Sequence, residues 1–417
     1  MTTTPRGSRP HVVIFGETNS GKSALFNALI GARHAIVSDV EGTTTDPVTR
    51  QMELLGFGPI SLTDTAGLND HSKLGKERMK KTARAYDSAD LGLYVLDAKT
   101  SKAENQKPET GIEEYQIVKD ELGKRGTPVI VVFTKKDLYG EEAIEDFKLR
   151  NELTPTHARS VNVSIEDIAS IERLREKIGT ALRITEAAAD KPLIADFVQR
   201  GESVIAAVVI DSESPKGRLI LPQMMFIREC VDYGINCMVS DMENLSANYN
   251  KLQPKLVVVD SQVFPEAAKF LPKDAGLTSF SILMARQKGE LGVFLDGIKA
   301  IKGLRAGAKI LIAEACTHNT NHEDIGRVKI PAALNKISGK SLEFVFAAAR
   351  EFPDNLSGFD LIVLCGGCML TRKEMTNRLR AAKEHGIAVT NYGILLAHAG
   401  KILERSVEVF EEKRGNK

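Results

Sequence analysis

The segment that most constrains this chain is the run Gly-Glu-Thr-Asn-Ser-Gly-Lys-Ser, from Gly16 to Ser23. An apolar run at residues 11–15 precedes it, and a helical pattern at residues 24–30 follows it. A strand that ends in glycine lets the backbone turn sharply, so that successive amide groups face inward and the next helix directs its positive N-terminus at the same point. A glycine-rich turn without a ligand is the alternative, but every fixed position of the motif falls in this strand–loop–helix context. The segment therefore predicts an α/β domain that binds a nucleoside triphosphate.

Two side chains of this loop have predicted contacts of their own. Lys22 is expected to lie against the β and γ phosphates, and the Ser23 hydroxyl is expected to bind Mg²⁺. The residues of the loop that are assigned to nucleotide binding are Gly16, Asn19, Ser20, Gly21, Lys22, Ser23 and Ala24.

Two later segments carry residues that would respond to the γ-phosphate. Residues 42–46 are polar and turn-prone, and Thr44 among them is expected to complete the Mg²⁺ shell. Residues 60–63 form a predicted strand that leads to Asp64, which would hold Mg²⁺ through water, and then to Gly67, whose amide would contact the γ-phosphate. We interpret both segments as nucleotide-dependent switches.

A third set of residues is suited to recognising the base of the nucleotide. Apolar runs at residues 91–97 and 129–133 are typical of buried parallel strands, and the second leads directly to Thr134-Lys135-Lys136-Asp137. A carboxylate at that strand end can accept two N–H bonds from guanine that adenine cannot offer, so Asp137 is predicted to select guanine. The residues predicted to bind the base are Thr134, Lys135, Asp137, Ser164 and Ile165.

In this order and at these spacings, the motifs resemble the GTPase family that includes the tRNA-modification GTPase and the ribosome-assembly GTPases Era and Der. The resemblance covers the first domain and implies GTP as the ligand and GTP hydrolysis as the activity. The chain departs from the family at two positions, because Thr134 stands where Asn is usual and Ile165 where Ala is usual. We expect weaker guanine binding, with selection by Asp137 retained.

The residue that follows Gly67 is Leu68, where many small GTPases have a water-positioning Gln. A leucine cannot orient water. The resemblance implies that a K⁺ ion, held partly by Asn19, takes the place of an arginine finger and stimulates hydrolysis. The alternative, that Asn19 is present for its tolerance of turn conformations, stays open. The predicted catalytic residues are Lys22, Asn19, Thr44, Asp64 and Gly67.

Size and charge limit what the rest of the chain can be. Its 417 residues, 42% of them apolar, suffice for two to four domains. Lys plus Arg (56) nearly equal Asp plus Glu (55), so no global electrostatic field favours nucleic acid or an anionic membrane.

No apolar run approaches the ~20 residues of a membrane span, and residues 1–10 lack the apolar core of a signal peptide, so a cytoplasmic location is expected. Five cysteines, an odd count, argue against a disulfide framework.

A linker at residues 187–192 separates the first domain, residues 1–186, from a small α/β segment, residues 187–270. This segment lacks clustered His, Asp or Glu, so we interpret it as an assembly module. Cys230 and Cys237 are interpreted as core residues in preference to metal ligands. Its predicted elements are β-rich runs at residues 204–211, 238–241 and 256–260 and a helix at residues 222–233.

Strands and helices alternate through residues 271–417, which predicts a parallel sheet with crossover helices. Cys316 and His318 follow one predicted strand, and Cys365 and Cys368 follow another. Because ligands bind at the carboxyl ends of parallel strands, the three cysteines can converge although they are distant in sequence. The predicted strands are residues 279–284, 309–314, 342–348, 360–364 and 387–391, and the predicted helices are residues 289–301, 373–385 and 392–403.

Three kinds of site fit this cysteine pattern. Three thiolates on open loops with a weaker fourth ligand suit an iron–sulfur cluster that keeps an exchangeable position. A structural zinc site with His318 as fourth ligand is the second kind. A redox disulfide or plain packing is the third.

A GTPase of this type followed by Cys-x-His and then Cys-x-x-Cys resembles, over the full length of the chain, the [FeFe]-hydrogenase maturation GTPase family, HydF. The resemblance implies an α/β protein of three domains: a P-loop GTPase domain at residues 1–186, a dimerisation domain at residues 187–270, and a parallel-sheet domain at residues 271–417. The last would bind a [4Fe–4S] cluster through three cysteines, Cys316, Cys365 and Cys368.

The fourth ligand of that cluster is left open by the sequence. Many relatives have His directly before Cys-x-x-Cys, and here that residue is Leu364. His318, His322 and Glu323 all lie near Cys316 in the sequence, and His318 or Glu323 is the predicted ligand. A non-cysteine ligand would be the one that an incoming diiron precursor displaces.

The resemblance also implies the function of the whole chain. It would be a GTP-hydrolysing scaffold, a homodimer or larger oligomer, that receives a diiron precursor made with two radical-SAM maturases and delivers it to apo [FeFe]-hydrogenase. The alternative is an Era- or Der-like GTPase of RNA or ribosome maturation with a structural zinc site.

Overall fold

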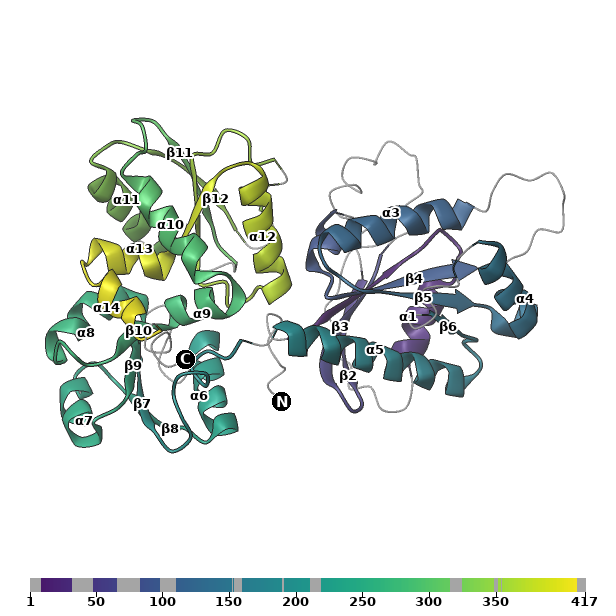
Figure 1. Ribbon diagram of the computed structural model, residues 1–417, viewed down its shortest axis with the longest axis horizontal. Helices are drawn as coiled ribbons and strands as arrows, with labels where there is room; N and C mark the ends of the chain where they lie inside the picture. Colours follow the sequence, from purple (N-terminus) through teal and green to yellow (C-terminus); the bar gives the residue numbers. More distant parts are fainter. Residues whose placement is uncertain are drawn as a thin grey trace, which may run out of the picture. The chain divides into compact units, whose positions relative to one another are not determined.

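The computed structural model describes residues 9–31, 48–65, 83–97, 110–151, 153, 160–189, 191–210, 219–315, 325–348, 352–353 and 355–410. The chain divides into two compact units, Met1–Ala189 and Asp190–Lys417, both of α/β construction (Figure 1). Among the residues that the structure describes, none of the helices combines the length and the apolar character that a membrane crossing requires.

The first unit is built on a six-stranded sheet with the strand order β2-β3-β1-β4-β5-β6. All neighbouring strands are parallel except the antiparallel pair β2 and β3. Figure 1 shows α3 on one face of this sheet and α1 with α5 on the other. The strands are β1 His11–Phe15, β2 Val48–Leu54, β3 Gly58–Asp64, β4 Leu91–Asp97, β5 Val129–Thr134 and β6 Ser160–Asn162, and the helices are α1 Lys22–Ile30, α3 Thr110–Lys124, α4 Lys136–Arg150 and α5 Ile168–Ala189.

Strand β1 shows why a continuous apolar run forms a central strand of this sheet. All five of its residues are buried. Val12 and Ile14 face the core beneath α1 and α5, whereas Val13 and Phe15 face the core beneath α3 and α4. Because the strand lies between two layers of helices, it has no polar face. Its parallel neighbours bring three carboxyl ends to one edge of the sheet, where the phosphate-binding loop begins.

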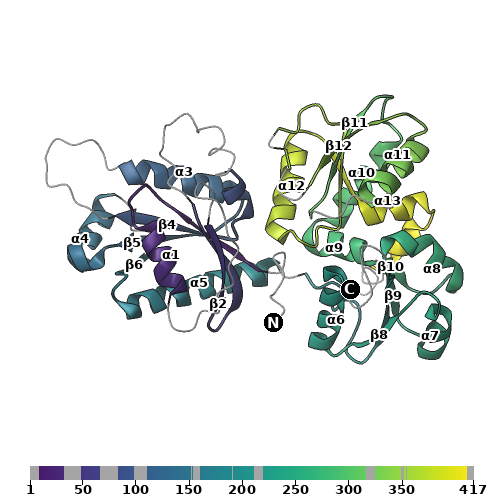
Figure 2. The same cartoon turned by 180° about the vertical axis from the view of Figure 1, so that it is seen from behind.

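The second unit contains two parallel four-stranded sheets, with strand orders β10-β9-β7-β8 and β12-β11-β13-β14 (Figure 2). The first sheet comprises β7 Ser203–Ala207, β8 Asn236–Ser240, β9 Leu256–Val259 and β10 Leu277–Ser279, with α6 Leu221–Tyr233, α7 Leu245–Leu252, α8 Phe264–Phe270 and α9 Phe280–Lys288. The second comprises β11 Lys309–Ala313, β12 Glu343–Ala347, β13 Leu361–Leu364 and β14 Ala388–Asn391, with α10 Leu291–Ile301, α11 Ile330–Ser338, α12 Arg372–Glu384, α13 Tyr392–Ala399 and α14 Leu403–Glu408.

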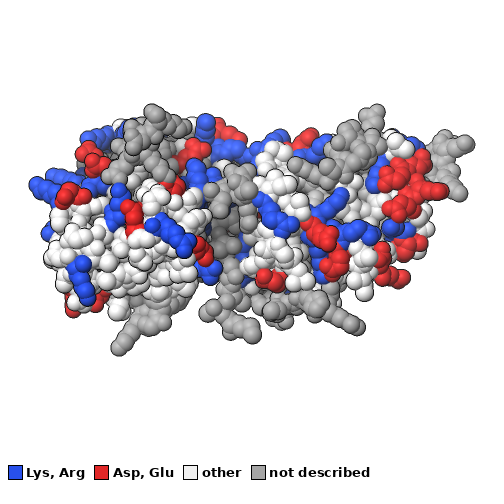
Figure 3. Space-filling model, turned by 60° about the horizontal axis from the view of Figure 1, so that its bottom comes forward, with Lys and Arg blue, Asp and Glu red and all other residues white. Residues whose placement is uncertain are grey.

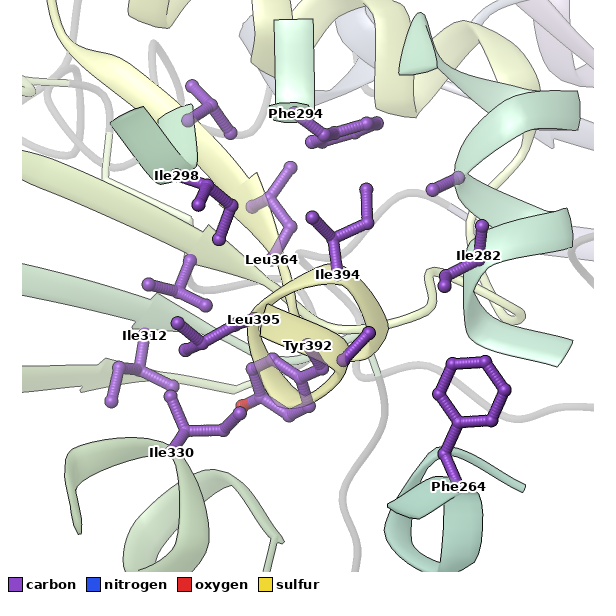
Figure 4. Packing of buried hydrophobic residues seen from close by; sticks show 14 of the residues in the cluster. Phe264, Ile282, Phe294, Ile298, Ile312, Ile330, Leu364, Tyr392, Ile394 and Leu395 are labelled. Carbon is purple, nitrogen blue, oxygen red and sulfur yellow. The ribbon is translucent and has the colours of Figure 1, made fainter. Parts of the chain in front are cut away.

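One hydrophobic cluster joins residues of both sheets of the second unit. Figure 4 shows Ile394 and Leu395 of α13 among side chains that include Phe294 of α10, Ile282 of α9 and Phe264 of α8. Helices α9 and α13 thus pack where the two sheets meet. The division between the second and third domains at residue 270 stays a prediction. Strand β10 of the first sheet, which pairs with β9, lies after that residue.

Three predicted elements of this unit differ from the observed ones in type or extent. The run predicted at residues 204–211 corresponds to strand β7, which ends at Ala207. The sequence predicts a strand at residues 279–284, but Ser279 ends the short strand β10 and caps α9, where its hydroxyl accepts from the Ile282 amide at 3.3 Å. Helix α9 is buried almost all round, so its sequence lacks the apolar–polar alternation that separates a helix from a buried strand. The single helix expected at residues 392–403 is divided into α13 and α14 at Gly400 and Lys401.

Charges of both signs lie on the surface of each unit, as Figure 3 shows for one face. This agrees with the near balance of basic and acidic residues in the sequence.

Candidate functional site: the nucleotide loop and the cysteine loop

The loop between β1 and α1 has the backbone of an anion-binding turn. Gly16 has a φ of 141°, and a Cβ at this position would lie 2.5 Å from the carbonyl oxygen of Val95. Gly21 has a φ of 96° and Asn19 a φ of 66°, so the loop enters the left-handed region twice more before α1 begins at Lys22. Only glycine fits the first position, because of both its torsion angle and its neighbour.

Lys22 and Ser23 present their polar groups at the start of α1. Lys22 is buried, and its ammonium donates to the Glu17 carbonyl oxygen at 2.5 Å. Burial holds its pKa below the ordinary lysine value, against the opposing charges of Asp64, Glu114 and Glu17. A buried cation beside a helix N-terminus is an arrangement that favours a phosphate anion.

The structure brings the two predicted Mg²⁺ residues of this region together. The Ser23 hydroxyl donates to Asp64 Oδ2 at 2.7 Å, since β3 and β1 are parallel neighbours and end side by side. Burial raises the pKa of Asp64, and the Ser23 hydrogen bond and Lys22 oppose that rise. A hydroxyl and a carboxylate are oxygen ligands of the kind that Mg²⁺ takes, so the donor set fits the ion. Thr44 and Gly67 lie outside the described residues.

The two base-reading segments are held to each other and to the phosphate loop. The Thr134 hydroxyl is buried and donates to the carbonyl oxygens of Ser20, at 2.8 Å, and Leu96, at 3.3 Å. The Lys136 amide donates to the Val163 carbonyl oxygen at 3.2 Å, which joins residues 134–137 to the segment that contains Ser164. Thr134 thus links the segment predicted to bind the base to the phosphate loop, although it departs from the family residue.

The remaining base residues lie around this connection. Lys135 has a left-handed φ of 60° and forms an ion pair with Asp97. Asp137 is exposed in the first turn of α4. The Ser164 amide donates to Ser170 Oγ at 3.1 Å, and the Ile165 side chain is half exposed. Their roles toward guanine stay predictions.

The Cys-x-x-Cys segment follows β13 directly. Cys365 Sγ accepts hydrogen bonds from the amides of Ala315, at 3.1 Å, and Gly367, at 3.4 Å. Ala315 lies just beyond β11, the neighbour of β13 in the sheet, and is the last described residue before Cys316. Burial, and next the neighbouring Cys368, raise the pKa of Cys365 to about 11. Amide donors to sulfur at the carboxyl edge of a parallel sheet suit a thiolate that binds a metal or cluster.

Lys288 was not found by the sequence reasoning, although it holds this segment. Its buried ammonium donates to the carbonyl oxygens of Gly367, Cys368 and Leu370, at 3.1, 3.0 and 2.7 Å. Burial lowers its pKa to about 8, and the charges of Cys368, Glu374 and Cys365 oppose that fall. A lysine at the end of an apolar helix, far from Cys365 in sequence, gives no signal that could have predicted the contact.

Cys230 and Cys237 belong to the packing of the second unit. Cys230 is fully buried, as predicted, and Cys237 is partly buried against the same cluster. The two thiols form a hydrogen-bonded pair, which raises the pKa of Cys230 and lowers that of Cys237. Within the described part of the chain no three His, Cys, Asp or Glu side chains form a metal-binding group. Cys316, His318 and Glu323 lie outside it.

Comparison with known proteins assigns both halves of the chain. The model of the family "50S ribosome-binding GTPase" matches residues 11–135. The hydrogen maturase F dimerization domain matches residues 193–289, and the hydrogen maturase F tetramerization domain matches residues 292–409. The chain belongs to the hydrogen maturase F family, HydF. Within this HydF chain the first unit is a P-loop GTPase domain.

Individual relatives match the GTPase domain. GTPase Der of Wolinella succinogenes is 36% identical over 176 residues, which are 41% of this chain and 35% of that protein. GTPase Der of Leptospira borgpetersenii is 34% identical over 169 residues, 39% of this chain and 33% of the relative. The tRNA modification GTPase MnmE of Xanthomonas oryzae is 45% identical over 94 residues, 22% and 21% of the two chains. This HydF chain thus spans about a third of the length of the Der proteins that it matches.

A solved structure is also similar to part of the chain. The crystal structure of the G domain of the T. maritima FeoB iron transporter has 27% sequence identity and a TM-score of 0.29, and the match covers 42% of this chain and 98% of that one.

Proposed function

We propose that this HydF chain is a GTP-hydrolysing scaffold and carrier, which binds a [4Fe–4S] cluster and assembles and delivers the diiron subcluster to apo [FeFe]-hydrogenase. The observation that carries the proposal is the Cys365 loop, where a thiol at the carboxyl edge of a parallel sheet accepts two amide hydrogen bonds. In the same chain, a phosphate-binding loop places Ser23 against Asp64.

In the GTPase domain the residues of the loop bind and orient the nucleotide. Lys22 and the loop amides would hold the phosphates, Ser23 and Asp64 would hold Mg²⁺, and Asp137 would select guanine. Thr44 and Gly67 would complete the γ-phosphate contacts. A K⁺ ion held in part by Asn19 would supply the positive charge that a catalytic arginine provides elsewhere.

In the second unit, Cys365 and Cys368 would hold the cluster together with Cys316. His318 or Glu323 would be the fourth ligand of that cluster, which could be exchanged. This chain supplies the donor set, and the amides of Ala315 and Gly367 stabilise the negative charge on the Cys365 sulfur. The diiron precursor is cargo, which a displaceable ligand would admit.

The matched domain names support self-association as a dimer or a tetramer. Consistent with an interface, β8 is an edge strand, and Val239 on it and Val231 and Tyr233 on α6 are exposed apolar residues. An exposed strand edge is a template for pairing with another chain. We further propose two radical-SAM maturases and apo-hydrogenase as partners and the cytoplasm as the location.

Metal analysis distinguishes this proposal from the alternative of a Der-like GTPase with structural zinc. The matches to Der proteins favour only the GTPase part of that alternative. The protein is purified without oxygen, and its iron, sulfide and zinc are measured. Iron and sulfide in equal amounts, with the broad visible absorption of an iron–sulfur protein, are expected. Colourless protein with bound zinc, even after reconstitution with iron and sulfide, would establish the alternative.

A further inference from the structure

The position of Lys288 is fixed by the architecture between the two sheets of the second unit. It is the last residue of α9, the helix that begins directly after β10 of the first sheet. Phe280, the first residue of α9, packs edge to face against Phe226 of α6 with ring centroids 5.7 Å apart. The helix is therefore anchored in the layer that carries the first sheet, while its other end reaches the loop that follows β13 of the second.

At that end the ammonium of Lys288 donates hydrogen bonds to the loop that follows β13. An ammonium has three N–H donors, and the carbonyl oxygens of Gly367, Cys368 and Leu370 accept from it at 2.7–3.1 Å. Lys288 is only 4% exposed. Removing an ammonium from water costs several kcal/mol unless hydrogen bonds replace the hydration. Here three carbonyl oxygens replace the hydration, and an apolar side chain would leave these acceptors without their donor, so the ammonium fixes the backbone of this loop.

Other contacts hold the same loop from the side of α9 and β14. The Ser281 hydroxyl donates to Asn391 Oδ1 at 3.1 Å, and Asn391 Nδ2 donates to the Cys365 carbonyl oxygen at 3.1 Å. The Cys368 side chain packs against the hydrophobic cluster that contains Phe226 and Phe280. The Cys-x-x-Cys loop is thus fixed on both sides by polar contacts, and the ammonium of Lys288 is bonded to the carbonyl oxygen of Cys368 itself.

We infer that Lys288 is a positioning residue of the metal site: it fixes the backbone of residues 367–370 and places a positive charge on the loop that carries Cys365 and Cys368, so that both thiolates are directed at one bound metal group. The inference rests on the proposed function, because it takes these cysteines to be cluster ligands. It adds that α9, which belongs to the layer of the first sheet, supplies an essential part of the site.

The test compares Lys288→Gln and Lys288→Arg with the unchanged full chain and with Lys299→Gln, a matched control in which an exposed lysine of α10 is changed. Co²⁺ is titrated into apo protein without oxygen, and thiolate-to-cobalt absorption reports binding. A Cys365→Ser/Cys368→Ser variant supplies the background from other thiols. We expect Lys288→Gln to bind Co²⁺ about 10- to 100-fold more weakly, the range for loss of an outer contact to a metal ligand. Lys288→Arg should recover part of this loss and Lys299→Gln should show none.

The midpoint potential of the reconstituted cluster is measured in each variant. It distinguishes an effect of the Lys288 charge on the cluster from a general loosening of the fold. Loss of the positive charge should lower the potential in Lys288→Gln, whereas Lys288→Arg should keep it near that of the unchanged chain. If Lys288→Gln fails to fold, as circular dichroism would show, the comparison of Lys288→Arg with Lys288→Met decides in its place. Unchanged Co²⁺ affinity and unchanged potential in the folded neutral variant would overturn the inference.

The Cys365→Ser/Cys368→Ser variant distinguishes an error in the role of Lys288 from an error in the proposed function. If Cys365→Ser/Cys368→Ser keeps its full iron and sulfide, the cysteines are not cluster ligands and the proposed function itself fails. If that variant loses the cluster while the neutral Lys288 variant behaves as the unchanged chain, only the role of Lys288 is wrong.

Discussion

The hydroxyl of Thr134 shows how one side chain can couple two parts of a nucleotide site. It bridges the Ser20 carbonyl of the phosphate loop and the Leu96 carbonyl at the end of β4. Thr134→Val keeps the shape but leaves two buried carbonyl acceptors without this donor. We expect about 1–3 kcal/mol lower stability and about tenfold weaker GTP binding, because the loop loses its link to the base segment. Fluorescent-nucleotide titration and urea unfolding measure the two effects.

The matched control for this change is Thr127→Val. Thr127 is also buried, and its hydroxyl also donates to a carbonyl oxygen, that of Ala89 at 3.0 Å, but it does not contact the phosphate loop. This variant should lose similar stability with unaltered nucleotide affinity. Equal affinity losses in both variants would show that Thr134 acts through general stability alone.

Asn19 allows a second test at the level of a single residue. Its left-handed φ of 66° is compatible with both interpretations, a K⁺ ligand and a turn-tolerant residue. If Asn19 holds the ion, replacing K⁺ by Na⁺ should slow hydrolysis by the unchanged protein, and Asn19→Ala should remove the difference between the salts. Thr18→Ala, which changes the exposed neighbour, should keep it. Steady-state phosphate release gives the rates, and equal rates of the unchanged protein in both salts contradict a K⁺ site.

The loop after β13 permits a test in which two adjacent glycines are compared. Gly367 has a φ of 65°, and a Cβ there would lie 2.4 Å from Met375 Cε, whereas the nearest atom to a Cβ on Gly366 is 3.5 Å away. Gly367→Ala should therefore cost about 1–3 kcal/mol and reduce the iron bound per chain, since the strain falls on the segment that presents the cysteines. Gly366→Ala should change neither. Iron analysis and thermal unfolding measure the two effects. Equal iron content in the Gly367→Ala and Gly366→Ala variants would contradict the idea that the backbone of this loop is constrained at Gly367.

Elements were predictable from sequence where one local rule decided the structure. The strands β1, β4 and β5 are continuous apolar runs between turn residues, and their predicted limits agree with the observed ones to within a residue. Helix α9 was mistaken for a strand because it is buried on nearly every side, so periodicity carried no information. The Lys288 contacts could not be predicted at all, since they join residues about 80 positions apart through packing of two sheets.

At the scale of the whole molecule, the two units have separate hydrophobic cores, so their sites should be separable. The phosphate loop draws its residues from Met1–Ala189, and the described cysteine loop with Lys288 lies in Asp190–Lys417. Lys22→Ala removes the cation that is predicted to contact the phosphates and should abolish GTP turnover while iron and sulfide content stay unchanged. In the reverse experiment, Cys365→Ser/Cys368→Ser should lose the cluster and retain basal GTP hydrolysis.

The paired design makes the outcome informative about coupling between the units. Phosphate release, iron and sulfide are measured on the same preparations, and circular dichroism establishes that each variant is folded. A buried lysine replaced by alanine can alter the loop locally, so Lys22→Arg, which keeps the charge, serves as a second variant. Loss of iron in a folded Lys22 variant would mean that nucleotide binding is needed to keep the cluster, and the sites would then be energetically linked. Full iron in both Lys22 variants, with full basal hydrolysis in the cysteine variant, is the result expected if the sites in the two compact units bind their ligands without energetic coupling.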